Sequence, residues 1–283
     1  PYRTLVCYKE GTLGENVCGS KCDPTTAWTG LWREGCSFPS GGACAPENGL
    51  TGQISWGEAT GSITVPVAYK NLRFWRGTAV ASATGTTTLP NGTIGYEYDF
   101  EQYASSYPSG RITLSSTNVG GNTHKLSIYR QPGGGLVFGA GTVQWSWGLD
   151  GTHDRGTSTP SVVVQQATVN LFADMGAQPG SLMSGLTAAS ASTDFSAPVV
   201  SITSPVHNAS ITTGTSVTIS GTAAEAGGGQ LVGVEILLDG GVTWFPASGT
   251  TSWTFGWTPT TAGTYSIRVR GFDDSGNMGV PGA

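Results

Sequence analysis

Residues 135–154, GLVFGAGTVQWSWGLDGTHD, and residues 161–180, SVVVQQATVNLFADMGAQPG, carry the strongest structural signal in the chain. The apolar run at 136–140 predicts a buried strand, and the aromatic residues after it predict a loop. Residues 163–175 are predicted to form a helix, followed by Gly176 as a C-cap. Together these elements are expected to close a domain. The predicted buried face of the helix, at spacings of three and four, is Val164, Ala167, Thr168, Leu171 and Met175.

The composition limits the class of the protein. The 283 residues suggest about two domains. Charged residues make up only 11% of the chain and the net charge is −5, so a nucleic-acid partner is not expected. Abundant Gly and 10% aromatic residues favour short strands joined by tight turns. No apolar run reaches the roughly 18 residues of a membrane span, and the start PYRTLVCYKE suggests a processed piece of a longer protein.

All five cysteines lie within the first 44 residues. Their clustering in a segment rich in Gly, Pro and Ser favours disulfides in an exported protein. Zinc is the alternative, because Cys18 and Cys22 have a spacing that zinc ligands use, but no second pair of that kind follows. The odd number leaves one thiol free or paired with a partner further upstream. The disulfide candidates are Cys7, Cys18, Cys22, Cys36 and Cys44.

Residues 1–187 are predicted to form a β-rich α+β domain with one clear helix. A second, short helix is predicted over residues 24–32, where Asp23 could cap the N-terminus. The predicted strands are short and cover residues 3–8, 52–56, 62–67, 72–75, 95–98, 111–115, 125–130 and 136–140.

Residues 188–196 are predicted to be a linker, because the surrounding SGLTAASASTDFSAP lacks apolar periodicity. In residues 197–283, apolar and polar residues alternate in short runs between turns, which predicts an all-β sandwich and makes the fold class mostly β. The runs are VVSITSP, SVTISGTA, VGVEILLDGG, WFPAS, SWTFGWTP and TYSIRVRGFDD.

The second domain resembles the bacterial immunoglobulin-like (Ig-like) modules of secreted and surface proteins. The stretches that carry the resemblance are APVVSITSP, LLDGGVTW and GTYSIRVRGFDDSGNMG. The resemblance implies an Ig-like β-sandwich and an extracellular or cell-surface location. The region has no Cys, so the inter-sheet disulfide of antibody domains cannot form here.

The first domain resembles the C-terminal region of the N,N-dimethylformamidase large-subunit-like proteins. The matching stretches are RTLVCYKE, DPTTAWTGLWRE, PENGLTG, LRFWRGT, GTIGYEYD, HKLSIYRQPGGGLVFGAGTVQWSWGLD and QQATVNLFADMG. The resemblance implies an amidotransferase-like half upstream, and it implies hydrolysis of a small amide at an iron held by tyrosines and a glutamate. The early cysteine cluster departs from the family pattern.

Tyr and Glu cluster at one place, and this place supplies the metal candidates that the resemblance suggests: Tyr96, Glu97, Tyr98 and Asp99. On a strand, Tyr96 and Tyr98 face one side and Glu97 faces the other. The four residues could therefore reach one ion only with a bend or a bulge. The alternative is that Glu97 or Asp99 makes a structural hydrogen bond or caps a loop.

The sequence offers two further kinds of site. Ser146, His153 and Asp154 could form a nucleophilic triad, but the sequence has no G-x-S-x-G turn to hold it. Calcium could bind the loop that contains Asp150 and Asp154, although ordinary Asx turns use the same residues. A second loop offers the same choice with Asp273, Asp274 and Asn277.

The aromatic loop supports a binding hypothesis. Trp145 and Trp147 share one face if the strand continues through them, and exposed Trp rings can stack on sugars, whereas buried ones fill the core. The binding candidates in this loop are Trp145, Trp147, Asp150, His153 and Asp154. The favoured function is binding or architecture in an exported bacterial protein, with polysaccharide or surface proteins as partners. The alternative is an iron-dependent amide hydrolase.

Overall fold

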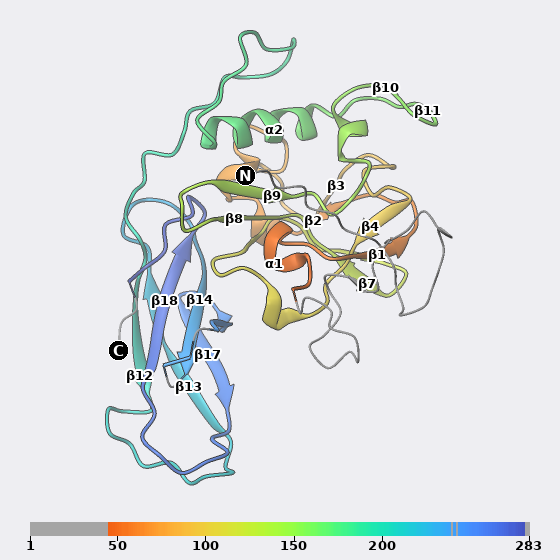
Figure 1. Cartoon of the computed structure of the whole chain (residues 1–283). Coiled ribbons are helices and arrows are strands. Elements are labelled where there is room, and N and C mark those ends of the chain that lie inside the picture. Colours follow the sequence, from red (N-terminus) through yellow and green to blue (C-terminus); the bar gives the residue numbers. More distant parts are fainter. Residues whose placement is uncertain (1–44, 239, 242, 281–283) are drawn as a thin grey trace, which may run out of the picture.

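The computed structural model describes residues 45–280 apart from residues 239 and 242, and it has two packed parts (Figure 1). The N-terminal region, residues 45–187, holds short strands and one long helix. The sandwich, residues 198–280, holds two sheets. The predicted mostly-β fold class is confirmed. The predicted strand at 3–8, the predicted helix at 24–32 and all five cysteines lie outside the described residues.

The strands of the N-terminal region pair in small antiparallel sheets. One sheet has three strands, in which β8 (Ser127–Arg130) lies between β5 (Ile112–Thr113) and β9 (Leu136–Gly139). The other sheets have two strands each: β1 (Ser55–Glu58) with β4 (Glu97–Asp99), β2 (Thr64–Val65) with β3 (Thr87–Thr88), β6 (Thr117–Val119) with β7 (Asn122–His124), and β10 (Thr152–His153) with β11 (Gly156–Thr157). The short helices between them are α1 (Asn48–Thr51), η2 (Val67–Tyr69), η3 (Arg73–Trp75), η4 (Ala104–Ser106) and η5 (Trp145–Gly148). Seven of the eight predicted strands fall in this part of the chain, and all but one of these overlap an observed strand.

The exception is the strand predicted over residues 72–75, which is wrong. This segment forms the 3-10 turn η3, in which the neighbours Phe74 and Trp75 are both buried, whereas a strand would send them to opposite faces. Trp75 Nε1 donates to Leu114 O at 3.0 Å. Asn170 Nδ2 donates to Phe74 O at 2.9 Å and to Arg76 O at 2.7 Å. The Asn170 side chain thereby satisfies two backbone carbonyls of this segment that are not paired in a strand.

The predicted helix is confirmed as α2 (Val162–Asp174). Ser161 caps its N-terminus by accepting a hydrogen bond from Val164 N at 3.4 Å. Gly176 follows its C-terminus with φ 76°, the left-handed conformation that glycine adopts most easily. Met175 was predicted to be buried but is 41% exposed, because it is the C-cap residue rather than part of the buried face. The buried apolar residues of α2 include Val164, Ala167 and Leu171, as predicted.

A row of amide side chains on α2 is also buried, which the apolar pattern did not predict. Gln166 Nε2 donates to Thr187 O at 2.9 Å, and Gln166 Oε1 accepts from Thr187 N at 2.8 Å. Gln165 Nε2 donates to Leu149 O at 2.8 Å. The segment after the helix is thereby tied back across it. No helix in the described part of the chain is long and apolar enough to cross a membrane.

The aromatic loop after β9 forms the 3-10 turn η5, so the expected continuation of the strand through both tryptophans is wrong. Trp145 turns into the core and packs edge-on against Phe138, with ring centroids 5.4 Å apart. Trp147 turns toward the β10–β11 hairpin, where its ring stacks on His153. The turn therefore sends the two indole rings into different surroundings.

The predicted sandwich is confirmed. One sheet has the order β12 (Val199–Ser204), β13 (Val217–Ala224), β17 (Ser252–Trp257), β16 (Ser248–Gly249), and the other has the order β15 (Phe245–Pro246), β14 (Leu231–Leu238), β18 (Ile267–Asp273). The buried side chains of its core are Ile219, Ala223, Val234, Ile236, Trp253 and Val269. Alternating burial along β13 fits a strand with one face toward this core.

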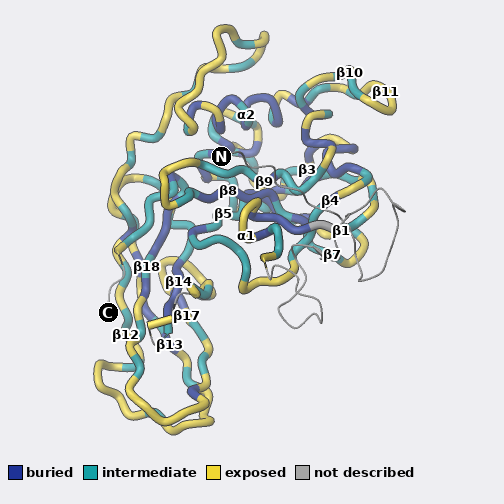
Figure 2. The backbone as a smooth tube through the Cα atoms, viewed as in Figure 1, coloured by how far each residue is buried: buried dark blue, intermediate teal, exposed yellow. Residues whose placement is uncertain are grey.

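The sandwich contributes side chains to the core of the N-terminal region, although each part also has a buried cluster of its own. Phe272 of β18 belongs to the buried cluster of the N-terminal region, and Val232 and Met278 pack against that cluster. Figure 2 shows β14 and β18 buried over much of their length beside the N-terminal region. Residues 188–196 contain no helix or strand, but they are pinned: Ser190 O accepts from Arg73 and Arg76, and Ser192 Oγ lies 2.8 Å from Ser275 Oγ.

Candidate functional site

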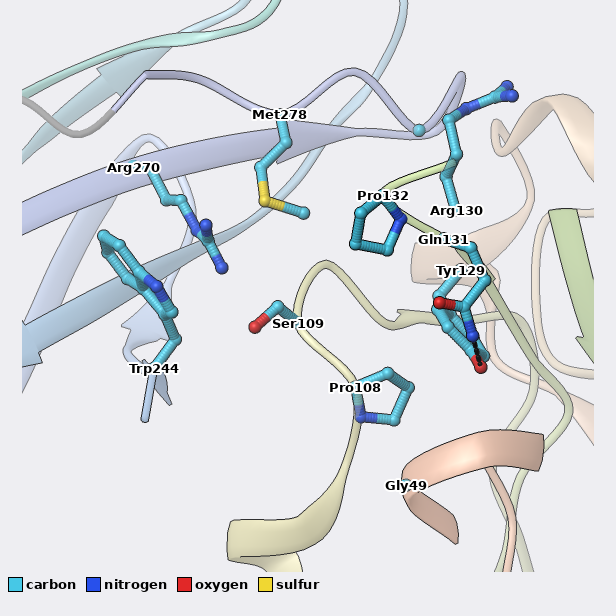
Figure 3. A pocket seen from close by; sticks show the side chains of 11 residues that line it. Gly49, Pro108, Ser109, Tyr129, Arg130, Gln131, Pro132, Trp244, Arg270 and Met278 are labelled. Carbon is cyan, nitrogen blue, oxygen red and sulfur yellow. Dashed lines mark hydrogen bonds between the residues drawn. The ribbon is translucent and has the colours of Figure 1, made fainter. Parts of the chain in front are cut away.

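An open groove with a volume of about 510 Å³ lies where the N-terminal region meets the sandwich (Figure 3). One wall comes from the end of β8, the loop after it and the loop before β5. The other wall comes from β18 and the loop before β15. The polar and aromatic residues in its lining are Ser109, Tyr129, Arg130, Gln131, Trp244 and Arg270.

The wall from the sandwich is built on an ion pair. Glu235 of β14 and Arg270 of β18 are partners in the antiparallel register, and Glu235 Oε2 accepts from Arg270 Nη2 at 2.8 Å and from Nε at 3.0 Å. Glu235 is only 5% exposed. The Arg270 guanidinium lies over the Trp244 ring, 3.7 Å from its centroid. In Figure 3 this guanidinium points into the groove beside Met278.

The opposite wall presents hydrogen-bonding groups. Gln131 Nε2 donates to the Tyr129 hydroxyl at 2.7 Å, and that hydroxyl donates to Leu50 O. Figure 3 shows the amide oxygen of Gln131 and the hydroxyl of Ser109 turned toward the hollow. Arg130 stands at the rim and donates to Gly134 O at 2.7 Å and to Ser275 O at 3.0 Å. The groove thus combines polar groups with the flat apolar faces of an indole and two prolines, Pro108 and Pro132.

The groove lining carries two arginines but no carboxylate, and the ion pair with Glu235 offsets the charge of Arg270. The single carboxylate of Glu235 lies behind Arg270. A concave site between two packed parts, with a few placed polar groups, is the common setting of a ligand site. Its chemistry suits a hydroxyl-rich ligand with flat apolar faces, neutral or negatively charged.

Three of the predicted binding residues come together at the β10–β11 hairpin. The Trp147 and His153 rings stack with centroids 3.9 Å apart and planes 11° apart, and Trp147 Nε1 donates to Asp154 Oδ1 at 3.2 Å. Arg155 covers the Tyr96 ring at 3.6 Å from its centroid. His153 therefore occupies one face of Trp147, so a sugar could stack only on the other.

The remaining two predicted binding residues lie apart from this cluster. Trp145 is in the core. The exposed Asp150 accepts from Thr152 N at 2.7 Å through Oδ1, which is the Asx-turn geometry that the sequence offered as the alternative to calcium binding. The five candidates thus do not share one surface.

The structure does not assemble the triad considered from the sequence. His153 Nδ1 donates to the backbone oxygen of Asp154 at 2.7 Å, and His153 Nε2 lies 3.0 Å from Ser158 Oγ rather than beside Ser146. The carboxylate of Asp154 faces Trp147 instead of the imidazole. Ser158 Oγ also lies 3.1 Å from Trp147 O, so its one proton has two competing acceptors.

The residues from Tyr96 to Asp99 do not fit the iron site that the family resemblance implies. Tyr98 is buried and its hydroxyl donates to Val119 O at 3.1 Å. Tyr96 lies under Arg155, and Glu97 is exposed. The bulge in this sheet lies in β1, so β4 stays regular and its adjacent side chains point to opposite faces. Their oxygens therefore do not meet at one point.

The second calcium candidate loop follows β18. Asp273 Oδ1 accepts from Ser275 N at 2.8 Å and from Asn277 N at 2.9 Å. Asp274 reaches across to the N-terminal region, where its Oδ2 accepts from Arg73 N at 2.6 Å. Asp273 therefore folds its own turn, and Asp274 joins the two parts of the molecule.

The groove was missed by sequence reasoning, because its walls are far apart in the chain. Arg130 and Gln131 stand in the quoted stretch YRQPGGG, but their partners across the groove are Trp244 and Arg270. The available signal was Trp244 itself, a large aromatic residue between a Gly-rich turn and a short strand. Only the docking of the sandwich shows that these residues face one another.

The comparisons with known proteins match the two parts in order. A family model described as "N,N-dimethylformamidase beta subunit-like, C-terminal" matches residues 1–158, and one described as "Bacterial Ig domain" matches residues 198–269. No curated protein matches the chain. Among solved structures, the Clostridium thermocellum CbhA fibronectin(III)-like modules are 14% identical in sequence, and the match covers 66% of this chain and 80% of that chain. The TM-score of 0.28 is too low to support an argument.

Proposed function

Because the chain belongs to the family of N,N-dimethylformamidase beta subunit-like C-terminal domains and carries a bacterial Ig domain, we propose that it is an exported bacterial protein with a binding and architectural role. In this proposal residues 1–187 and 197–283 are two domains, joined by residues 188–196. The protein acts at the cell surface or in the secreted medium. Its ligand is a polysaccharide that lies in the groove between the domains.

The observation that carries the proposal is the pairing of Trp244 and Arg270 across from Gln131 and Ser109. Arg270 covers one face of the Trp244 indole, so its other face and the two prolines are the apolar surfaces that could contact the C–H groups of a sugar ring. Gln131, Ser109 and the guanidinium of Arg270 offer hydrogen bonds to its hydroxyls. Glu235 holds Arg270 in place, so the wall is ordered before a ligand arrives.

Ligand binding by the full 283-residue chain tests the proposal. A glycan array would select a ligand, and calorimetry would measure its affinity. Trp244→Ala is expected to weaken binding tenfold or more, which corresponds to about 1.4 kcal/mol. Trp147→Ala is the matched control, because it removes an indole from the other candidate surface, and it should leave affinity unchanged. Loss of binding in Trp147→Ala alone would move the site to the hairpin, and no binding to any glycan would reject the polysaccharide ligand.

The amide-hydrolase alternative is not proposed. The cluster that suggested it, residues 96–99, does not present its oxygens to one ion. No other observation within the described residues favours that reaction over ligand binding.

A further inference from the structure

Three carboxylates from separate segments meet where residues 188–196 join the sandwich. Asp194 belongs to that segment, Glu225 follows β13 and Asp273 ends β18. Each offers an oxygen, and these oxygens lie within 4.8 Å of one another. Oxygens that bind one calcium ion at about 2.3–2.6 Å lie within roughly 5 Å of each other, so the spacing fits a shared ion.

One carboxylate oxygen in this cluster lacks a partner. Glu225 is half-buried as a residue, but its Oε2 atom is shielded from solvent and has no hydrogen-bond partner among the described residues. The other oxygen of the same group, Oε1, accepts from Ala226 N at 2.7 Å and from Gly227 N at 2.9 Å. These bonds fix the carboxylate and leave Oε2 without a donor. A buried charged oxygen without a donor or a cation is costly, so it points to a ligand that carries positive charge.

Among residues 45–280 that the structure describes, no cation forms an ion pair with these carboxylates. The ion pairs in the part of the chain that the structure describes involve Asp154, Asp174, Glu101 and Glu235, and none involves the three clustered carboxylates. Arg73 interacts electrostatically with Asp194, but its guanidinium is hydrogen-bonded to another carboxylate. Nη2 donates to Asp174 Oδ1 at 2.6 Å, and Nε donates to Asp174 Oδ2 at 2.9 Å.

The carboxylates are held in fixed positions. Asp194 accepts from Ser196 N at 2.9 Å and from Gly229 N at 3.0 Å. Asn277 Nδ2 donates to Asp273 Oδ2 at 2.9 Å and to Asp194 O at 3.1 Å, which joins the two segments. Because these bonds order the oxygens in advance, an ion would not have to organise the loop.

We propose that Asp194, Glu225 and Asp273 bind one calcium ion, which ties residues 188–196 to the sandwich. A hard divalent cation is the ligand that carboxylate oxygens favour. Calcium suits the site better than magnesium, because it accepts irregular sets of oxygens whereas magnesium demands near-octahedral geometry. The ion would neutralise the cluster and satisfy Glu225 Oε2.

Calorimetric titration of Ca²⁺ into the chelator-treated full chain tests this site. We expect one ion per chain and a higher melting temperature with calcium. Glu225→Gln keeps the shape of the side chain and the acceptor for Ala226 and Gly227, and it should weaken calcium binding at least tenfold. Asp273→Asn should do the same, but Asp273 also holds its own turn, so Glu225→Gln is the decisive variant.

Asp150→Asn is the matched control, because Asp150 accepts a backbone hydrogen bond in the other loop that the sequence nominated for calcium. This variant should bind calcium as the wild type does. No binding by the wild type at millimolar Ca²⁺, unchanged binding by Glu225→Gln, or equal affinity for Mg²⁺ would overturn the proposal. Calcium binding that persists in Trp244→Ala would show that this site is independent of the groove.

Discussion

Glu235 accepts a hydrogen bond from the amide nitrogen of Gly110 at 2.6 Å, although the two residues belong to different parts of the molecule. Its second oxygen holds Arg270 in the groove wall. Gly110 has φ 67°, a left-handed conformation that favours glycine, whereas an added Cβ would meet only the movable end of the Met278 side chain. A single carboxylate thus joins the sandwich to the N-terminal region and positions a residue of the candidate site.

Glu235→Ala is expected to destabilise the protein by about 3–5 kcal/mol, because it leaves Arg270 without its partner in a largely buried position. The measurement is the free energy of unfolding in urea, followed by tryptophan fluorescence. Asp154→Ala is the control, since its ion pair with Arg155 is exposed and should contribute less than about 1 kcal/mol. Equal losses in the two variants would contradict the role given to Glu235.

His124 is expected to make stability depend on pH. Burial lowers its pKa to about 4, its Nε2 donates to Ala140 O at 3.1 Å, and its Nδ1 is buried without a partner. The unfolded chain binds a proton below about pH 6.5, whereas the folded chain resists protonation down to about pH 4. The free energy of unfolding should therefore fall, by ~3 kcal/mol from this residue, as pH decreases through that window.

Urea unfolding at pH 7 and pH 4.5 checks the role of His124, with His124→Gln as the comparison. The wild type should lose more stability between the two values than the variant does, because glutamine takes up no proton. Equal losses in both proteins would show that other groups cause the dependence.

Asn170→Leu is expected to cost about 1–3 kcal/mol, because it leaves the carbonyls of Phe74 and Arg76 without their donor. Thermal and urea unfolding would measure the loss. Phe172→Leu is a control on the same helix, since Phe172 is 45% exposed and lies away from the amide row. A loss confined to the control would show that the amide row of α2 does not stabilise η3.

Iron analysis separates the two functions considered from the sequence. After incubation with ferrous iron and gel filtration, we expect no stoichiometric iron on the chain, and Glu97→Gln should behave as the wild type does, because Glu97 is exposed on a regular strand. One iron per chain that disappears in Glu97→Gln would overturn the binding reading and favour an amide hydrolase.

The periodicity of apolar residues was sufficient to predict the secondary structure of segments that bury one face. The strand at β9, the helix α2 and the alternating strands of the sandwich follow from residues close together in the sequence. It failed at η3, where Phe74 and Trp75 are both buried because Leu114 and Asn170 supply the hydrogen bonds. Those partners are distant in the chain and leave no mark on the local pattern.

The candidate sites also divide into those formed by residues close together in the sequence, which could be predicted, and those formed by distant residues, which could not. The sequence nominated Trp147, His153 and Asp154, which do meet, because the turn η5 and the hairpin after it are close together in the chain. It did not pair Trp244 with Gln131, since their proximity depends on the docking of the sandwich. It also nominated the loop of Asp273 for calcium, but Asp194 and Glu225 reach that loop only in the folded chain.

The core that Phe272 shares with the N-terminal region has a mechanical consequence. In a protein whose domains make no contact with one another, the domains separate and unfold one by one under tension. Here the sandwich cannot separate from its neighbour without exposing Phe272, breaking the bond from Gly110 to Glu235 and releasing Asp274 from Arg73. We expect the chain to behave under load as a stiff spacer that holds the groove at a fixed angle.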